Sequence, residues 1–205
     1  MPTTRLPESD LAAAAQQAFD LSAGTPGVVV GVANGADTWF GSYGQADADT
    51  AITPETRLRI GSVTKSVTGT ILLQFVESGA IGLDEQLSTY VPDVAEGLTV
   101  RMLATMRSGI ADYTADPALV AQIIADPTAP RTSAEVIAAG LAAPRLFAPD
   151  AQFAYSNTNY VILGSLLEQV SGTPFATLLG DRVLTPLGLA ETWWPGDSSS
   201  MPDPF

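Results

Sequence analysis

The sequence predicts a mostly helical α+β protein that begins with one helix and one β-hairpin and continues as an all-helical domain. Asn34-Gly35, a strong hairpin turn signal, separates the apolar run Val28 to Ala33 from a second strand-like run, Thr38 to Tyr43. Beyond these runs the chain shows helical periodicity broken at intervals by Pro and Gly, with no later strand pattern. We therefore expect three regions: a partial α/β domain at 1–56, a helical domain at 57–195 and a loose tail at 196–205.

Local start and stop signals support each helix. Ser9-Asp10 can cap a first helix, and Gly79 can end the helix that follows residue 62. Thr132-Ser-Ala-Glu135 is a capping box, and Thr173-Pro174 is expected to start a last helix that reaches about Leu184, with Pro at its first position. Helical patterns also cover Thr99 to Met106, Pro117 to Ala125, Thr132 to Ala142 and Asn157 to Val170.

The hairpin lacks companions in this sequence. A two-stranded hairpin alone is marginal in water, and its open edges favour pairing with further strands. We therefore expect the sequence to be a fragment or truncated form of a longer protein. A second copy or a partner chain could also supply strands at the exposed hairpin edge.

Composition excludes several kinds of chemistry. The chain contains no histidine and no cysteine. A Ser-His-Asp triad, a cysteine nucleophile, a zinc site with His or Cys ligands and a disulfide are therefore impossible. A hydrolase built from this sequence must use Ser or Thr with a Lys or Tyr base, or else paired carboxylates.

Charge and hydropathy limit the partners. The net charge of −13 and the pI near 4.1 argue against nucleic acid and against anionic membrane surfaces. No apolar run approaches the length of a membrane span. The first twenty residues do not form a signal peptide, so the chain is cytoplasmic as written, or extracytoplasmic if a signal was removed.

Ser62 and Lys65 form the first candidate catalytic pair. Lys65 is the only lysine, against eight arginines, and it stands three residues after Ser62 at the start of a helical pattern. Side chains three apart on a helix are neighbours, and a desolvated lysine can become a neutral base whereas arginine cannot. The structural alternative is that Ser62 caps the helix and Lys65 is a solvated first-turn residue. Against it, a cation in the first turn opposes the helix dipole.

Tyr155-Ser156-Asn157, just before a helical pattern, forms the second candidate motif. In one interpretation Ser156 or Asn157 caps that helix and Tyr155 packs in the core. In the other, Tyr155 and Asn157 reach the pair formed by Ser62 and Lys65. A phenol beside an ammonium has a lowered pKa, and its phenolate can accept the serine proton.

These motifs resemble those of a known superfamily. Ile60 to Lys65 and Tyr155-Ser156-Asn157 are similar to the Ser-x-x-Lys and Tyr-x-Asn motifs of the serine beta-lactamases and penicillin-binding proteins. The Tyr-x-Asn form is typical of the branch with class C beta-lactamases, D-alanyl-D-alanine carboxypeptidases and related esterases. Further segments that resemble this branch are Thr99 to Tyr113 and Ser171 to Leu189, so the likeness covers roughly residues 10 to 195.

The resemblance implies a beta-lactamase/transpeptidase-like fold, incomplete here, and a role for each motif residue. Ser62 would be the acylated nucleophile, with its backbone N–H in the oxyanion hole, and Lys65 would ease removal of its proton. Tyr155 would be the general base, and Asn157 would bind the amide of the substrate. The implied substrates are beta-lactams, D-alanyl peptides or small esters, and no metal or other cofactor is implied.

The sequence departs from this branch in one motif. The branch carries a Lys, His or Arg followed by Ser or Thr and then Gly, on a strand after the Tyr-x-Asn segment. The matching triplet here, Arg107-Ser108-Gly109, precedes Tyr155 and follows a helical pattern, so we do not assign it that role. We expect low activity in this form. Two alternatives stay open: a catalytically inactive penicillin-recognising or peptide-binding module, and one part of a split hydrolase.

Overall fold

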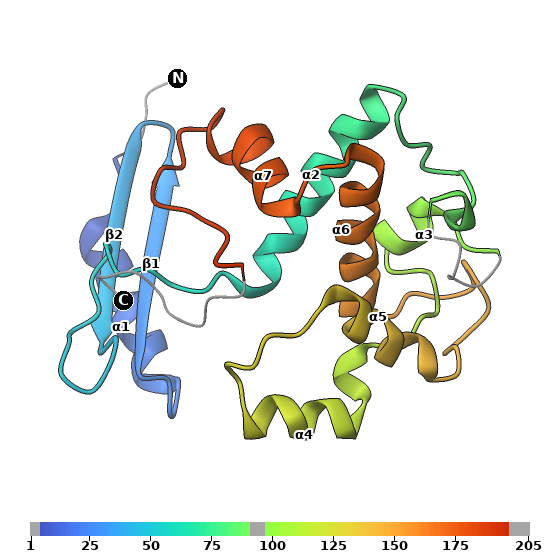
Figure 1. Ribbon diagram of the computed structural model, residues 1–205. Helices are drawn as coiled ribbons and strands as arrows, with labels where there is room; N and C mark the ends of the chain where they lie inside the picture. Colours follow the sequence, from blue (N-terminus) through green and yellow to red (C-terminus); the bar gives the residue numbers. More distant parts are fainter. Residues whose placement is uncertain (1–4, 91–96, 197–205) are drawn as a thin grey trace. The chain divides into compact units, whose positions relative to one another are not determined.

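The computed structural model describes residues 5–90 and 97–196 (Figure 1). Within these residues the protein has α+β architecture, with one antiparallel sheet of two strands followed by helices, which confirms the predicted fold class. The chain divides into two compact units, one extending to Arg59 and the other beginning at Ile60. The expected loose tail lies, apart from Gly196, outside the described residues.

The first unit consists of one helix and the hairpin. Helix α1 (Glu8–Leu21) precedes strands β1 (Gly27–Asn34) and β2 (Asp37–Gly44). Tyr43 links β2 to α1, because its hydroxyl donates to the Ala12 carbonyl at 3.1 Å and its ring stacks on Phe19 at 6.3 Å between centroids.

The hairpin forms where the sequence predicts it, whereas the start of the helix before it differs from the prediction. Asn34 pairs with Asp37, so the two loop residues are Gly35 and Ala36. Gly35 takes the positive φ of +64° that this tight loop needs, while Asn34 completes the ladder. Helix α1 starts at Glu8 after Pro7, so Ser9 and Asp10 lie within its first turn and do not cap it.

The second unit is built around α6 (Asn157–Ser171). Its neighbours are α2, α3, α5 and α7, which pack against it (Figure 1). Four apolar side chains of α6 are fully buried in the core: Ile162, Leu163, Leu166 and Leu167. The remaining helices of this unit are α2 (Thr64–Glu77), α3 (Val100–Ala104), α4 (Pro117–Ala125), α5 (Ser133–Ala142) and α7 (Phe175–Leu179), with a π-helical turn at Gly180–Leu184 and 3-10 turns at Gly61–Val63, Leu87–Thr89 and Tyr113–Ala115.

The helix ends show which local signals were decisive. The capping box is present, with Thr132 accepting from the Glu135 N–H and the Glu135 carboxylate accepting from the Thr132 N–H. Gly79 follows α2 at φ +76°, where the Ala80 N–H donates to the Phe75 carbonyl in a Schellman arrangement. Both signals had been predicted from the sequence.

The start of α7 differs from the prediction. Pro174 is the N-cap and Phe175 the first helical residue, so Pro does not occupy the first helical position and Thr173 is not the cap. The reason is a tertiary contact: the Phe175 N–H donates to the Glu168 carboxylate of α6 at 2.7 Å. A carboxylate from a neighbouring helix thus satisfies the donor that a local cap would have taken.

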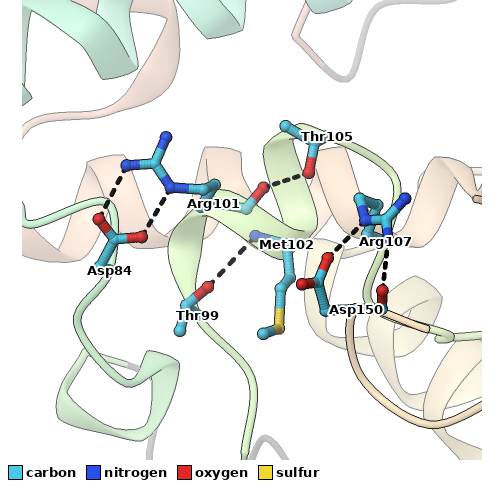
Figure 2. Close-up of polar contacts among 7 residues, drawn as sticks. All are labelled: Asp84, Thr99, Arg101, Met102, Thr105, Arg107 and Asp150. Atoms are coloured by element: carbon cyan, nitrogen blue, oxygen red, sulfur yellow. Dashed lines mark hydrogen bonds and ion pairs between the residues drawn. The ribbon is translucent and has the colours of Figure 1, made fainter. Parts of the chain in front are cut away.

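Polar contacts fix the short helix α3 at both ends (Figure 2). Thr99 caps it by accepting from the Met102 N–H. Arg101 makes a bidentate ion pair with Asp84, with N–O distances of 2.6 and 2.8 Å. Arg107, just after the helix, pairs with Asp150, which lies in the loop that leads to Tyr155. The segment between α3 and α4 is thereby tied to the loop before α6.

Candidate active site

Ser62 lies in a tight turn at the mouth of α2. The turn is the 3-10 helix Gly61–Val63, and Gly61 has a φ of +51°, a left-handed conformation that glycine adopts without strain. Val63 is the N-cap of α2, and the Ser62 hydroxyl is bonded to side chains rather than to the helix. Ser62 therefore does not act as the helix cap, and its hydroxyl is exposed to solvent.

The structure brings the four predicted site residues together. The Ser62 Oγ lies 2.7 Å from the Tyr155 Oη, a contact in which either oxygen can donate. The Lys65 Nζ donates to the Ser62 Oγ at 3.1 Å and to the Asn157 Oδ1 at 2.6 Å. A candidate nucleophile, two candidate proton carriers and a polar side chain thus share one cluster, which Tyr155 and Asn157 join from more than ninety residues away.

Lys65 also faces two aromatic rings. Its Nζ is 4.9 Å from the centroid of Tyr155 and 5.8 Å from that of Tyr160, both within the range of cation–π attraction. Tyr160 had not been singled out from the sequence. Its position three residues after Asn157 was the available signal, because that spacing places both side chains on one face of α6.

The electrostatics of the cluster lower the pKa of one of its phenols. The pKa of the Tyr155 phenol lies below its ordinary value, chiefly because Lys65 hydrogen-bonds to it, and next because of the hydrogen bond with Ser62. Desolvation and the charge of Asp112 oppose this shift. Tyr155 is 48% exposed, so its hydroxyl is open to an incoming molecule. A phenolate 2.7 Å from a serine oxygen can act as a general base.

Ser156 does not cap α6 with its side chain. It is buried, and its hydroxyl donates to the Ala111 carbonyl at 3.1 Å. The Thr158 hydroxyl donates to the same carbonyl at 2.8 Å and accepts from the Tyr113 N–H at 2.9 Å. The segment from Ala111 to Tyr113 therefore holds the start of α6. Asp112 belongs to this segment and contacts Asn157, a role that sequence reasoning missed.

The triplet Arg107-Ser108-Gly109 lies in the turn after α3 and not on a strand. Ser108 is buried, where its hydroxyl donates to the Asn159 Oδ1 at 2.6 Å and accepts from the Ile110 N–H at 3.0 Å. Gly109 has a φ of +74°, and a side chain there would collide with the Phe147 carbonyl. These contacts give the triplet a structural role beneath the site.

The acidic side chains of the described residues do not gather into a metal site. No group of three or more Asp and Glu side chains in residues 5–90 and 97–196 is placed to hold a metal ion. In the same residues, no helix combines the length and the apolar character that crossing a bilayer requires.

Comparison with known proteins gives concordant matches. The sequence profile of the Beta-lactamase family matches residues 11–204. A D-aminopeptidase of Brucella anthropi is 34% identical over 171 residues, which is 81% of this chain and 32% of that protein. A D-stereospecific amidohydrolase from Streptomyces sp. superposes with a TM-score of 0.84 at 36% identity, covering 94% of this chain and 59% of that one. A D-amino acid amidase from Ochrobactrum anthropi SV3, complexed with L-phenylalanine, has a TM-score of 0.80 at 30% identity, covering 94% and 56%.

The chain is shorter than each of these matched proteins. The chain spans about one third of the D-aminopeptidase and somewhat more than half of the two enzymes of known structure. Nevertheless, the family profile extends over nearly all of this sequence, and the structural matches agree with it. The chain belongs to the beta-lactamase family of serine hydrolases.

Proposed function

We propose that this chain carries the nucleophile and the general base of a serine hydrolase that works through an acyl-enzyme. The observation that supports this most strongly is the contact of the Ser62 Oγ with both the Tyr155 Oη and the Lys65 Nζ. The Tyr155 phenolate takes the Ser62 proton as the Oγ attacks the carbonyl carbon. The Lys65 ammonium stabilises the phenolate before this transfer.

The remaining steps follow from the same groups. The oxyanion that forms on the carbonyl accepts a hydrogen bond from the Ser62 backbone N–H. Its collapse breaks the bond to the leaving group, and Tyr155 returns the proton to the departing nitrogen or oxygen. Water then attacks the acyl carbon while Tyr155 takes its proton. As the bond between the acyl carbon and the Ser62 Oγ breaks, Tyr155 passes that proton to the Oγ, which restores the hydroxyl and the phenolate. Asn157 holds Lys65 by accepting its hydrogen bond at Oδ1. Its NH₂ group donates a hydrogen bond to the amide of the substrate.

For the substrate, we propose amides of D-amino acids, in preference to beta-lactams or small esters. The names of the similar proteins support this choice, because a D-aminopeptidase, a D-stereospecific amidohydrolase and a D-amino acid amidase all match at 30% identity or more. Stereospecific amide cleavage is therefore the activity to test first.

The test is ammonia release from D-phenylalanine amide and from L-phenylalanine amide, with Ser62→Ala as the control. We expect release from the D-amide that exceeds release from the L-amide at least tenfold, a ratio equivalent to about 1.4 kcal/mol, and none from the variant. Equal rates on both enantiomers would rule out the proposed stereospecificity. Release that persists in Ser62→Ala would rule out the proposed nucleophile.

A second candidate is binding without turnover. No Lys, His or Arg followed by Ser or Thr and then Gly occurs after Tyr155 in this sequence, so no residue here is assigned as a second oxyanion donor. Losing one such donor typically costs about a hundredfold to a thousandfold in rate. A Ser62 adduct that forms with a beta-lactam and is never released would favour this candidate, as would reversible binding without any adduct.

A further inference from the structure

Asp112 has a specific relation to Asn157. One carboxylate oxygen, Oδ2, accepts from the Asn157 backbone N–H at 3.1 Å and from the Asn157 Nδ2 at 2.8 Å. The other oxygen, Oδ1, accepts from the Thr114 N–H at 3.0 Å. Asp112 therefore binds both the first backbone donor of α6 and the side-chain amide that faces Lys65.

The amide of Asn157 is held between two charged groups that each permit one orientation. An ammonium can only donate, so Lys65 requires the Oδ1 of Asn157. An ionised carboxylate can only accept, so Asp112 requires the Nδ2. Rotating the amide by half a turn would set donor against donor on one side and acceptor against acceptor on the other.

We propose that Asp112 is a positioning residue that fixes the Asn157 amide so that its Oδ1 holds Lys65 beside Ser62 and Tyr155. The inference concerns the geometry of the site, and its catalytic consequence rests on the proposed function. Asp112 uses one hydrogen of the Asn157 NH₂ group, and the second hydrogen is then directed by the same contact.

The first test follows Lys65 directly and needs no activity. Because Lys65 is the only lysine, protein labelled with ¹³C at lysine Cε gives one side-chain signal. Asp112→Ala should move this signal toward the position of the unfolded chain. In Asp112→Asn the new amide oxygen can still accept from the Asn157 backbone N–H and from the Asn157 Nδ2, so the Lys65 signal should stay near the wild-type position.

Asp116→Ala is the matched control. Asp116 lies four residues later and accepts two backbone hydrogens, from Ala118 and Leu119, as the cap of α4. It should leave the Lys65 signal in place. The proposal is overturned if folded Asp112→Ala keeps the wild-type signal, or if Asp116→Ala shifts it equally.

The second test is the rate at which a fluorophosphonate labels Ser62. A hydrogen bond to a charged group stabilises its partner strongly enough that losing it should slow the labelling of Ser62 in Asp112→Ala about tenfold to a hundredfold. Asp112→Asn should largely restore the labelling rate. In an Asn157→Ala background, Asp112→Ala should cost no more than about twofold further, because its effect passes through Asn157. Full, additive loss in that background would overturn the positioning role.

The two tests separate the possible failures. If wild-type Ser62 is not labelled, the proposed function fails, and the Lys65 signal alone decides the inference. If Asp112→Ala does not fold, Asp112→Ser replaces it, because its hydroxyl keeps a helix cap but cannot accept both Asn157 hydrogens as the carboxylate does. The same direction of change in signal and rate is then expected.

Discussion

At the scale of single residues, the chemistry of the site depends on one cation. Lys65 contacts the Ser62 hydroxyl, the Asn157 amide and the face of the Tyr155 ring. No other lysine exists in the sequence, and arginine could not replace it as a compact donor of three hydrogens that is able to lose a proton. The groups that act on the Tyr155 phenol are therefore few: Lys65, Ser62 and the carboxylate of Asp112.

This arrangement predicts how Tyr155 titrates. Its pKa is lowered by Lys65 first, so the phenolate forms at a lower pH than in a free tyrosine. Lys65→Met should raise the titration midpoint, because desolvation and the Asp112 charge then oppose ionisation with only Ser62 favouring it. The measurement is the ultraviolet absorbance of tyrosinate against pH, with Tyr155→Phe subtracted to isolate this phenol. Any rate limited by Tyr155 as base should show an acid limb that moves to higher pH in Lys65→Met.

Asp112→Asn supplies the opposite shift as a control. Removing that negative charge should lower the Tyr155 pKa further, so the midpoint moves to lower pH. A midpoint that is unchanged in both variants would show that neither charge acts on the phenol.

Much of the site could be predicted at this scale, and the missing part has a physical reason. The three-residue step from Ser62 to Lys65 follows from helix geometry, and a lone lysine is visible in the composition. Asp112 could not be assigned its partner, because nothing local indicates that its carboxylate meets a helix start forty-five residues later. Such contacts are set by tertiary packing.

At the scale of the elements, α2 has two functions. It carries Lys65 in its first turn, and other side chains of the same helix are buried in the core. Leu72 is 1% exposed and Leu73 is 58% exposed, although they are adjacent and identical in chemistry. The same helix therefore offers a matched pair of substitutions that differ in burial alone.

Leu72→Ala should destabilise the protein by about 2–5 kcal/mol, because it leaves a cavity in the buried core. Leu73→Ala should change stability by about 0.5 kcal/mol or less, since it removes little buried surface. Chemical denaturation followed by circular dichroism of both variants checks this. Comparable losses in the two would contradict the burial of α2 described here.

The elements also show where local signals suffice. The capping box at Thr132 and the glycine at 79 determine their helix ends, because all the hydrogen bonds involved are local. Thr173 failed as a cap because Glu168 of α6 provides the acceptor for Phe175. The turn signal Asn34-Gly35 correctly located the hairpin, and the strand ladder extends one residue further than the apolar run, through Asn34.

At the scale of the whole molecule, the sheet is a small part of the described structure. Among the described residues it has two strands, and such a sheet has two edges without a neighbouring strand. Phe40 on β2 is 58% exposed. Self-association or pairing with a partner chain through this edge stays a prediction. The cluster of Ser62, Lys65, Tyr155 and Asn157 lies within the unit that begins at Ile60.

The central claim is that Ser62, Lys65 and Tyr155 form a working nucleophile in this chain. It is tested most directly by incubating the folded chain with a fluorophosphonate, which reacts with an activated serine whatever its substrate, and measuring the intact mass, with Ser62→Ala in parallel. We predict a mass increase equal to one phosphonyl group on the wild type and none on the variant. An equal adduct on Ser62→Ala, or no adduct on a chain shown to be folded, would contradict the claim.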